Sequence, residues 1–166
     1  MCVNSEARMR QRGFLAACCL LLAAFASLPP AHCAPGGSWP RWRGPDGDGI
    51  SRETGWNPKA LTGGPRVLWR ADIGFGFSSA AIEGRRLYTM GCKGENYILW
   101  CLNADTGKTI WRYEFPNLYR DPQATPTIDR DSVYALGWEG ILFCLNSADG
   151  KLKWKKDLVA DFGAVQ

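Results

Sequence analysis

Histidine is almost absent from this chain of 166 residues, which contains a single one, His32. It lies at the end of an apolar N-terminal stretch typical of a leader, so the processed chain is expected to contain none. This absence excludes nucleophiles paired with histidine, zinc sites with histidine ligands and histidine general bases. Enzymes that depend on these groups are therefore not expected.

Carboxylates with the spacing of a catalytic or metal site are also lacking. Four aspartates lie in expected turns, where this residue type commonly hydrogen-bonds the backbone: Asp105, Asp129, Asp131 and Asp149. Residues 46–51 begin like a calcium loop, but Ile50 and Ser51 replace a ligand and the turn glycine. We therefore expect no catalytic, cofactor-binding or metal-binding residue.

The chain has no large excess of positive or negative charge, and its cysteines do not have the spacing of a metal site. The first 33 residues carry three arginines and one glutamate, so their removal lowers the net charge from +4 to +2. The one basic cluster, residues 151–156, is expected on the solvated face of a strand, which argues against nucleic acid as a partner. Cys92, Cys101 and Cys144 are expected to be buried free thiols, and the alternative is that the odd cysteine of an exported chain pairs with another molecule.

Residues 1–33 have the order of features found in an export signal. Arg8, Arg10 and Arg12 precede an apolar run over residues 13–28, and a Pro-Pro break with small residues follows. The run is shorter than the roughly 20 apolar residues of a membrane span. We expect cleavage after Cys33, no transmembrane anchor after cleavage, and export to the periplasm, the cell surface or the medium.

The strongest positive feature is an internal repeat. The stretch Ile-Leu-Trp-Cys-Leu-Asn-Ala-Asp-Thr-Gly-Lys of residues 98–108 returns 43 positions later as Ile-Leu-Phe-Cys-Leu-Asn-Ser-Ala-Asp-Gly-Lys. Upstream positions match with a shift of 46, and the extra three residues lie in an expected hairpin tip at Cys92–Tyr97. A period of this size in β-rich sequence is typical of propeller blades.

Each copy predicts one four-stranded blade. The first, about residues 79–114, has strands expected at 79–82, 86–91, 97–103 and 109–114, and the second, about 124–157, at 124–128, 132–137, 141–146 and 152–157. The fold class is thus expected to be all-β, an incomplete propeller of two antiparallel blades in residues 67–166. An extended segment, 34–66, precedes the blades.

Seven positions are expected to build the blades rather than to bind a ligand. Gly107 and Gly150 are expected to supply positive φ in turns. The tryptophans are spaced by 42 and 43 residues, each is expected to end an outer strand, and burial against a neighbouring blade explains their spacing better than a ligand-stacking ladder does. The structural repeat positions are Trp69, Tyr88, Gly107, Trp111, Tyr134, Gly150 and Trp154.

Residues 102–111, Leu-Asn-Ala-Asp-Thr-Gly-Lys-Thr-Ile-Trp, resemble the A-x-T-G-K-x-x-W signature of the pyrroloquinoline-quinone-type (PQQ-like) β-propeller repeat. The second copy departs from it at Ser147 and Asp149. Residues 39–45, Trp-Pro-Arg-Trp-Arg-Gly-Pro, resemble the opening of exported bacterial proteins of this family. The resemblance implies that the tryptophan of one blade docks on the next blade.

The resemblance implies two different activities. Some members are quinoprotein dehydrogenases that hold PQQ and calcium on the propeller axis, and others, such as the outer-membrane assembly lipoprotein of the Bam complex, are scaffolds. No position here matches the cofactor or base residues of the enzymes. We expect a non-catalytic scaffold or binding module with a protein partner or small ligand at one propeller face. The alternative is part of a PQQ dehydrogenase whose active residues lie in other blades.

Two blades are fewer than the about 4–8 that close a propeller. One further outer strand, with Trp69, is expected at Val67–Arg70, and 12 residues follow Trp154. The sequence therefore favours an N-terminal fragment of a longer propeller. The alternative is a ring assembled from several short chains.

Overall fold

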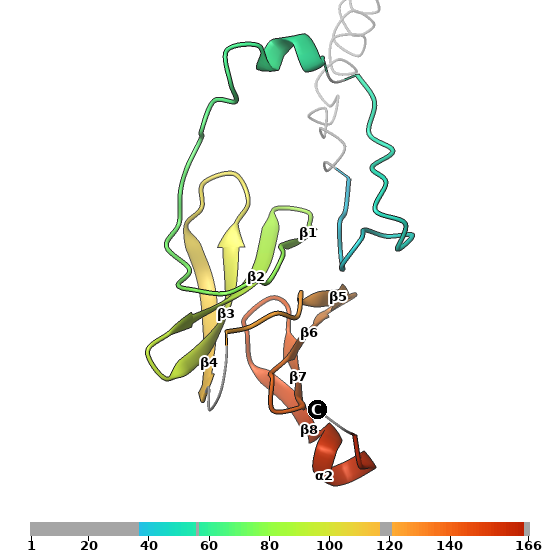
Figure 1. Ribbon diagram of the computed structural model, residues 1–166, viewed down its shortest axis with the longest axis vertical. Helices are drawn as coiled ribbons and strands as arrows, with labels where there is room; N and C mark the ends of the chain where they lie inside the picture. Colours follow the sequence, from blue (N-terminus) through green and yellow to red (C-terminus); the bar gives the residue numbers. More distant parts are fainter. Residues whose placement is uncertain (1–36, 56, 117–120, 165–166) are drawn as a thin grey trace, which may run out of the picture. The chain divides into compact units, whose positions relative to one another are not determined.

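The computed structural model describes residues 37–55, 57–116 and 121–164 (Figure 1). The expected signal peptide, residues 1–33, lies outside these residues. The first sheet contains β1 (Ala81–Glu83), β2 (Arg86–Lys93), β3 (Asn96–Asn103) and β4 (Thr109–Pro116). The second sheet contains β5 (Thr127–Asp129), β6 (Ser132–Leu136), β7 (Ile141–Asn146) and β8 (Leu152–Asp157).

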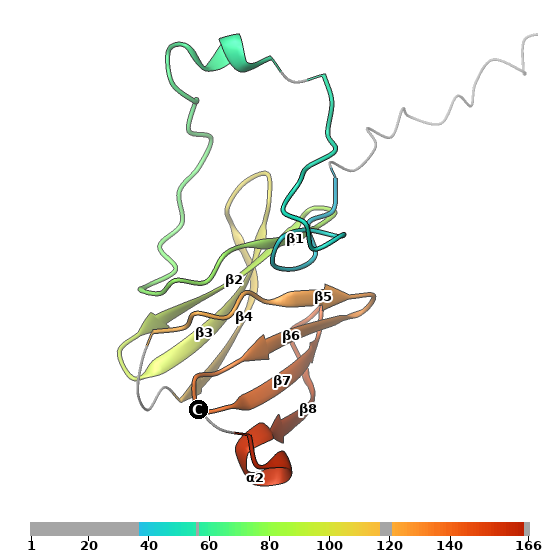
Figure 2. The ribbon, with the colours of Figure 1, turned by 45° about the vertical axis from the view of Figure 1, so that its right-hand side comes forward.

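Both sheets are four-stranded antiparallel meanders. Their strand orders are β1-β2-β3-β4 and β5-β6-β7-β8, and Figure 2 shows the second set of four strands side by side. The register of β3 and β4 shifts between Cys101 and Leu102, and that of β7 and β8 shifts at the equivalent Cys144 and Leu145. The predicted all-β fold with two four-stranded blades that do not close a ring is confirmed.

The strand predictions were accurate at β7 and β8 and less so at the first strand of each sheet. These first strands, β1 and β5, have three residues each and begin two and three residues later than expected. The expected outer strand at Val67–Arg70 is wrong, because these residues form no strand in the described structure. They run as irregular chain because no neighbouring strand is there to pair with them.

Two short helices were not predicted. A 3-10 helix, η2 (Pro58–Leu61), is capped by Asn57, whose side chain accepts from the Lys59 N–H at 3.0 Å. The helix α2 (Leu158–Phe162) is capped by Asp157, which accepts from two backbone N–H groups, and it ends at Gly163 with φ of +66°. Neither helix contains a buried residue, and no helix of the described part is long and apolar enough to cross a membrane.

The main core lies between the two sheets. Alternate residues of each strand face it, as the period of two in a strand requires. From the first sheet it includes Tyr88, Met90, Leu99, Cys101 and Trp111 and from the second Val133, Ala135, Phe143 and Leu145. A second cluster lies on the other face of the first sheet, where Ile73 packs against Ile98, Trp100 and Leu102. Both faces of the first sheet are therefore covered.

The N-terminal segment 37–53 adds to the first strand of both sheets. Trp39 and Ile82 of β1 exchange two backbone hydrogen bonds of 2.8 and 2.9 Å, and the Ile128 N–H of β5 donates to the Pro40 carbonyl at 2.7 Å. The segment therefore connects the two sheets at β1 and β5. The sequence did not predict this contact. It predicted only that the segment before the blades is extended.

Gly44 is the position at which this segment has no room for a side chain. Its φ is +80°, and an added Cβ would lie 2.7 Å from Cζ3 of the Trp39 ring. We expect Gly44→Ala to destabilise the segment by about 1–3 kcal/mol through overpacking. Limited proteolysis within residues 37–53 measures this, because the detached segment is cleaved faster than the docked one.

Gly47→Ala is the matched control for this substitution. Gly47 also has a positive φ, +71°, but nothing lies within 4 Å of its added Cβ. The control separates backbone strain from the clash with the ring. Equal proteolysis rates for the two variants would contradict the role assigned to Trp39.

Candidate functional site

The repeat positions meet where the first sheet contacts the turn between β7 and β8. Trp111 is the third residue of β4, and its indole Nε1–H donates to the Ser147 carbonyl at 3.1 Å. The Tyr88 hydroxyl donates to the same carbonyl at 3.0 Å. Gly150 lies against the ring, because an added Cβ would be 2.6 Å from Cε3 of Trp111. One turn of the second sheet thus receives two side chains of the first.

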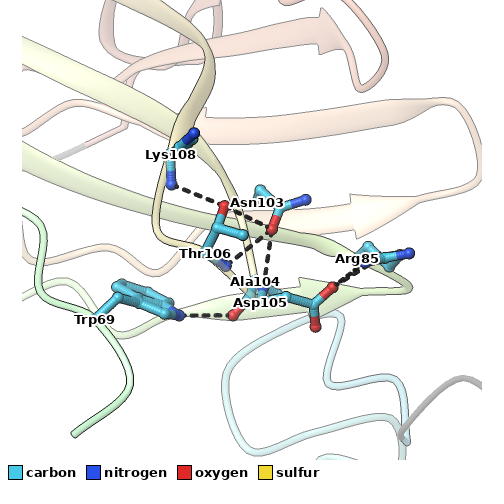
Figure 3. A network of polar contacts seen from close by, with 7 residues as sticks. All are labelled: Trp69, Arg85, Asn103, Ala104, Asp105, Thr106 and Lys108. Atoms are coloured by element: carbon cyan, nitrogen blue, oxygen red, sulfur yellow. Dashed lines mark hydrogen bonds and ion pairs between the residues drawn. The ribbon is translucent and has the colours of Figure 1, made fainter.

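The same arrangement occurs one repeat earlier in the chain. Trp69 donates from Nε1 to the Ala104 carbonyl at 3.0 Å (Figure 3). Its ring lies where a Cβ on Gly107 would stand. Ala104 and Gly107 are the repeat equivalents of Ser147 and Gly150. Trp69 and Trp111 therefore each dock on the glycine turn that follows them in the chain, although Trp69 comes from a segment that is not a strand.

An asparagine organises each glycine turn. Oδ1 of Asn103 accepts from the backbone N–H groups of Asp105 and Thr106 at 3.1 and 2.9 Å, and from the Thr106 hydroxyl at 2.9 Å (Figure 3). Asn146 accepts from the Ala148 N–H at 2.8 Å. These contacts hold the turn in one conformation, and the tryptophan that precedes the turn in the chain donates to the carbonyl of the residue after the asparagine.

The positive φ expected at the turn glycines is present. Gly107 has φ of +69° and Gly150 of +73°, and each N–H donates to the carbonyl of its turn asparagine at 2.8 and 2.9 Å. A glycine is needed for two reasons at once, because the backbone is left-handed and the indole ring occupies the space of a side chain.

Tyr134 and Trp154 are the counterparts of Tyr88 and Trp111 in the second sheet. Their ring centroids are 5.9 Å apart at 55°, against 5.8 Å and 56° for the first pair. Trp111 is 9% exposed whereas Trp154 is 42% exposed, and no hydrogen bond of its Nε1 is found within the described residues. The second pair of rings therefore has the separation and angle of the first pair, but no glycine turn among the described residues packs against it.

Burial raises the pKa of one thiol and two tyrosine hydroxyls in the first sheet. Desolvation raises the pKa of the Cys101 thiol to about 11 and that of the Tyr97 hydroxyl to about 12. It also raises the pKa of Tyr88 well above its usual range. Cys101 and Cys144 are buried free thiols, as expected, and Cys92 is buried too. A thiol with a raised pKa is a poor nucleophile near neutral pH.

These shifts predict a loss of stability at alkaline pH. A group whose pKa is raised by folding holds its proton more tightly in the folded chain, so its contribution is complete below the unfolded pKa and declines above it. For Cys101 this decline begins near its ordinary value of 9.0 and continues to about 11. We expect the free energy of unfolding from denaturant titrations to fall across that range, and Cys101→Ala to reduce the slope. A rising free energy there would contradict the burial argument.

The acidic side chains of the calcium-like stretch pair with an arginine. Among the described residues, no group of three or more histidine, cysteine or acidic side chains is close enough to hold a metal ion. Asp46 and Asp48 of the calcium-like stretch each form an ion pair with Arg52, at 3.1 and 3.0 Å. Both aspartates therefore have a positively charged partner within the N-terminal segment.

Two surface hollows lie near the N-terminal segment. One of about 650 Å³ is lined by Trp39, Ile50 and Ile82, with Arg52 and Glu53 among its polar residues. The other, of about 370 Å³, lies between Trp42, Phe77 and residues 123–125. Both are open and neither gathers groups that could activate a substrate, so the docked tryptophans remain the better-defined site.

Sequence reasoning located the tryptophans and glycines but missed the asparagines that order the glycine turns. Asn103 and Asn146 recur 43 residues apart, which is the signal that could have identified them. The expectation that each tryptophan ends an outer strand is wrong: Trp111 and Trp154 are third in β4 and β8. Each is paired with the cysteine at which the register shifts, Cys101 for Trp111 and Cys144 for Trp154.

The chain is similar to several proteins of known structure. It shares 23% identity with BamB from Moraxella catarrhalis, with a TM-score of 0.43 over 52% of this chain and 26% of that one. A europium-containing methanol dehydrogenase gives 19% and 0.40 over 46% and 14%, and the quinohemoprotein alcohol dehydrogenase ADHIIG from Pseudomonas putida HK5 gives 19% and 0.42 over 54% and 14%. The chain thus spans well under a third of each protein.

No curated protein sequence matches the chain. A family model described as outer membrane protein assembly factor BamB matches residues 59–165, which include both sheets and all seven repeat positions. That range is more than half of the chain. The chain therefore belongs to this PQQ-like β-propeller repeat family.

Proposed function

We propose that this chain is a non-catalytic propeller module that serves as a scaffold for protein contacts. The observation that carries the proposal is how the repeat positions are used. Trp69, Trp111 and Tyr88 donate their polar hydrogens to backbone carbonyls of the following turn, so these groups hold blades together. The family description, an outer membrane assembly factor, supports the same function.

The chemistry of the described side chains supports this proposal. The cysteines are buried, the aspartates of the calcium-like stretch are paired with Arg52, and the aromatic rings at the turns are packed against glycine. A PQQ dehydrogenase would instead need groups that bind the quinone carboxylates and calcium oxygen ligands. No observation on this chain specifically favours that alternative.

Binding of PQQ and calcium distinguishes the two functions. Because the alternative puts the active residues in other blades, the test uses a full-length relative that contains all of its blades. We expect its equilibrium dialysis against PQQ with calcium to show no saturable binding, with a PQQ dehydrogenase apoenzyme as the positive control. Calcium-dependent binding of one quinone per chain would contradict the scaffold proposal. A redox change of the bound quinone on adding an alcohol or sugar would establish the alternative.

Export is part of the same proposal and is tested separately. The leader features of residues 1–33 predict that the exported chain begins at Ala34. N-terminal sequencing of the protein recovered from a periplasmic extract measures this directly. Recovery of the chain with its arginine-rich start intact, in the membrane fraction, would contradict the cleaved signal.

A further inference from the structure

The stretch at residues 39–45 contains two tryptophans whose surroundings differ. The Trp39 ring packs on Gly44, and the Trp39 backbone pairs with β1. The Trp42 ring is instead 65% exposed, and its Nε1–H donates no hydrogen bond within the described residues. Packing of the fold therefore explains the first tryptophan of the stretch and leaves the second without a contact of its own.

Trp42 is not an isolated exposed side chain, because it shares a surface hollow with a second aromatic ring. Trp42 and Phe77 both line the hollow of about 370 Å³. Phe77 is 76% exposed, and within the described residues neither ring pairs with another aromatic ring. Exposed apolar side chains that occur singly are ordinary, but a patch of them marks an interaction site. The other lining residues are Gln123, Ala124 and Thr125.

Backbone hydrogen bonds fix the segments that carry the two rings. The Phe77 N–H donates to the Pro122 carbonyl at 2.8 Å, which attaches Phe77 to the chain that leads into β5. Trp42 lies in a turn closed by the Gly44 N–H, which donates to the Arg41 carbonyl at 3.0 Å. The hollow is therefore formed before a ligand arrives, and binding has little backbone left to order.

The chemistry of the lining limits the ligand. Among the described residues that line the hollow, none is charged, so a ligand with carboxylates, such as PQQ, would find no cation there. Two donor groups are free within the described residues, the Nε1–H of Trp42 and the side-chain amide of Gln123. The matching ligand is uncharged, has apolar rings that pack on aromatic side chains, and carries groups that accept hydrogen bonds.

A proline-rich segment in the polyproline II conformation has these properties. Its backbone carbonyls have no partner within the helix, and such segments bind grooves lined by aromatic side chains. The hollow is open, so it suits a chain that continues beyond it better than a small sugar, because small molecules bind in pockets that enclose most of their surface. Proline also fixes φ, so the segment loses little conformational freedom on binding.

We propose that the hollow at Trp42 and Phe77 binds an uncharged, proline-rich segment of a partner protein. Proline rings pack on the two aromatic rings, and carbonyls of the segment accept from Trp42 Nε1 and from the Gln123 amide. The proposal rests on the proposed scaffold function and names the kind of partner that the scaffold binds.

Titration of the chain with acetylated and amidated hexaproline is the direct test. Calorimetry measures the Kd, and nitrogen-15 NMR follows the Trp42 indole N–H, assigned by its loss in Trp42→Phe. We expect saturable binding that shifts this signal and leaves that of the buried Trp111 in place. A peptide of the same length made of glycine and serine is flexible and should not bind. A lack of saturable hexaproline binding would overturn the proposal.

Phe77→Ala and Phe75→Ala form a matched pair of variants. Both side chains are largely exposed, but of the two only Phe77 lines the hollow. We expect Phe77→Ala to weaken hexaproline binding at least about tenfold, as at other aromatic residues that dominate an interface. Phe75→Ala should leave the Kd unchanged. Equal effects of the two substitutions would show that the peptide binds elsewhere and overturn the assigned site.

Gln123→Ala covers the case in which a ring substitution disturbs the fold. It removes one donor and no ring, so we expect a loss of affinity of about fivefold. An unchanged Kd in both Gln123→Ala and Trp42→Ala would overturn the assigned contacts.

A neutral oligosaccharide and the quinone separate the remaining outcomes. Displacement of hexaproline by maltohexaose, with the same shift of the Trp42 signal, would make a sugar the ligand and overturn the assigned partner. Quinone binding in the dialysis described above would defeat the scaffold function and leave the hexaproline titration intact. Failure of the titration would remove this partner and leave the dialysis result unchanged.

Discussion

Replacing Trp111 by alanine is expected to lower the free energy of unfolding by about 3–5 kcal/mol, as for other large aromatic residues removed from a core. The ring is 9% exposed, packs on Gly150 and Tyr88, and donates to the Ser147 carbonyl. Its removal leaves a cavity between the two sheets that their strands cannot close. Denaturant unfolding followed by circular dichroism measures the loss.

Trp154→Ala provides the matched control for this substitution. Trp154 has the equivalent position in the second sheet and the equivalent tyrosine neighbour, Tyr134. It is 42% exposed, and no glycine turn of residues 37–55, 57–116 and 121–164 packs against its ring. We expect a loss of only about 1 kcal/mol, which is typical of a substitution that leaves no closed cavity. Equal losses at the two positions would show that docking on the turn does not stabilise the fold.

Gly150→Val is expected to have the second large effect. At φ of +73° a β-branched residue is strained by about 1–2 kcal/mol. Its Cβ would also lie 2.6 Å from the Trp111 ring, and overpacking of this kind adds about 1–3 kcal/mol. Thermal and denaturant unfolding of the variant measure the combined loss, because the ring must leave the turn or the turn must change conformation.

Gly84→Val separates the two causes. Gly84 lies in a turn with φ of +57°, and nothing is within 4 Å of its added Cβ. We expect it to show the backbone strain alone. If Gly84→Val and Gly150→Val lose the same free energy, the indole ring is not what excludes a side chain at position 150.

The repeat predicted the fold well because each blade depends on local features of the sequence. The hairpins β2–β3 and β7–β8 follow from alternating apolar residues and glycine turns, and their existence needed no knowledge of distant contacts. The short strands β1 and β5 were placed less accurately. Their limits are set by pairing with the neighbouring strand and with residues 39–40, which lie far away in sequence.

The docking positions were predictable in identity but not in their contacts. Spacing identified Trp111 and Gly150 separately, yet only the structure shows that the ring of one occupies the side-chain space of the other. The backbone carbonyl of Ser147 could not have been foreseen, because any residue supplies such an acceptor. Trp69 shows that the same contact forms from irregular chain, which strand prediction alone does not anticipate.

The coupling between positions 111 and 150 tests the central claim, that a tryptophan of one blade is held by the glycine turn of the next. In a double-mutant cycle of Trp111→Ala and Gly150→Val, we expect the cost of Gly150→Val to fall by about 1–3 kcal/mol once the ring is absent. The remaining cost should match that of Gly84→Val. Additive losses, with no coupling between the two positions, would contradict the claim.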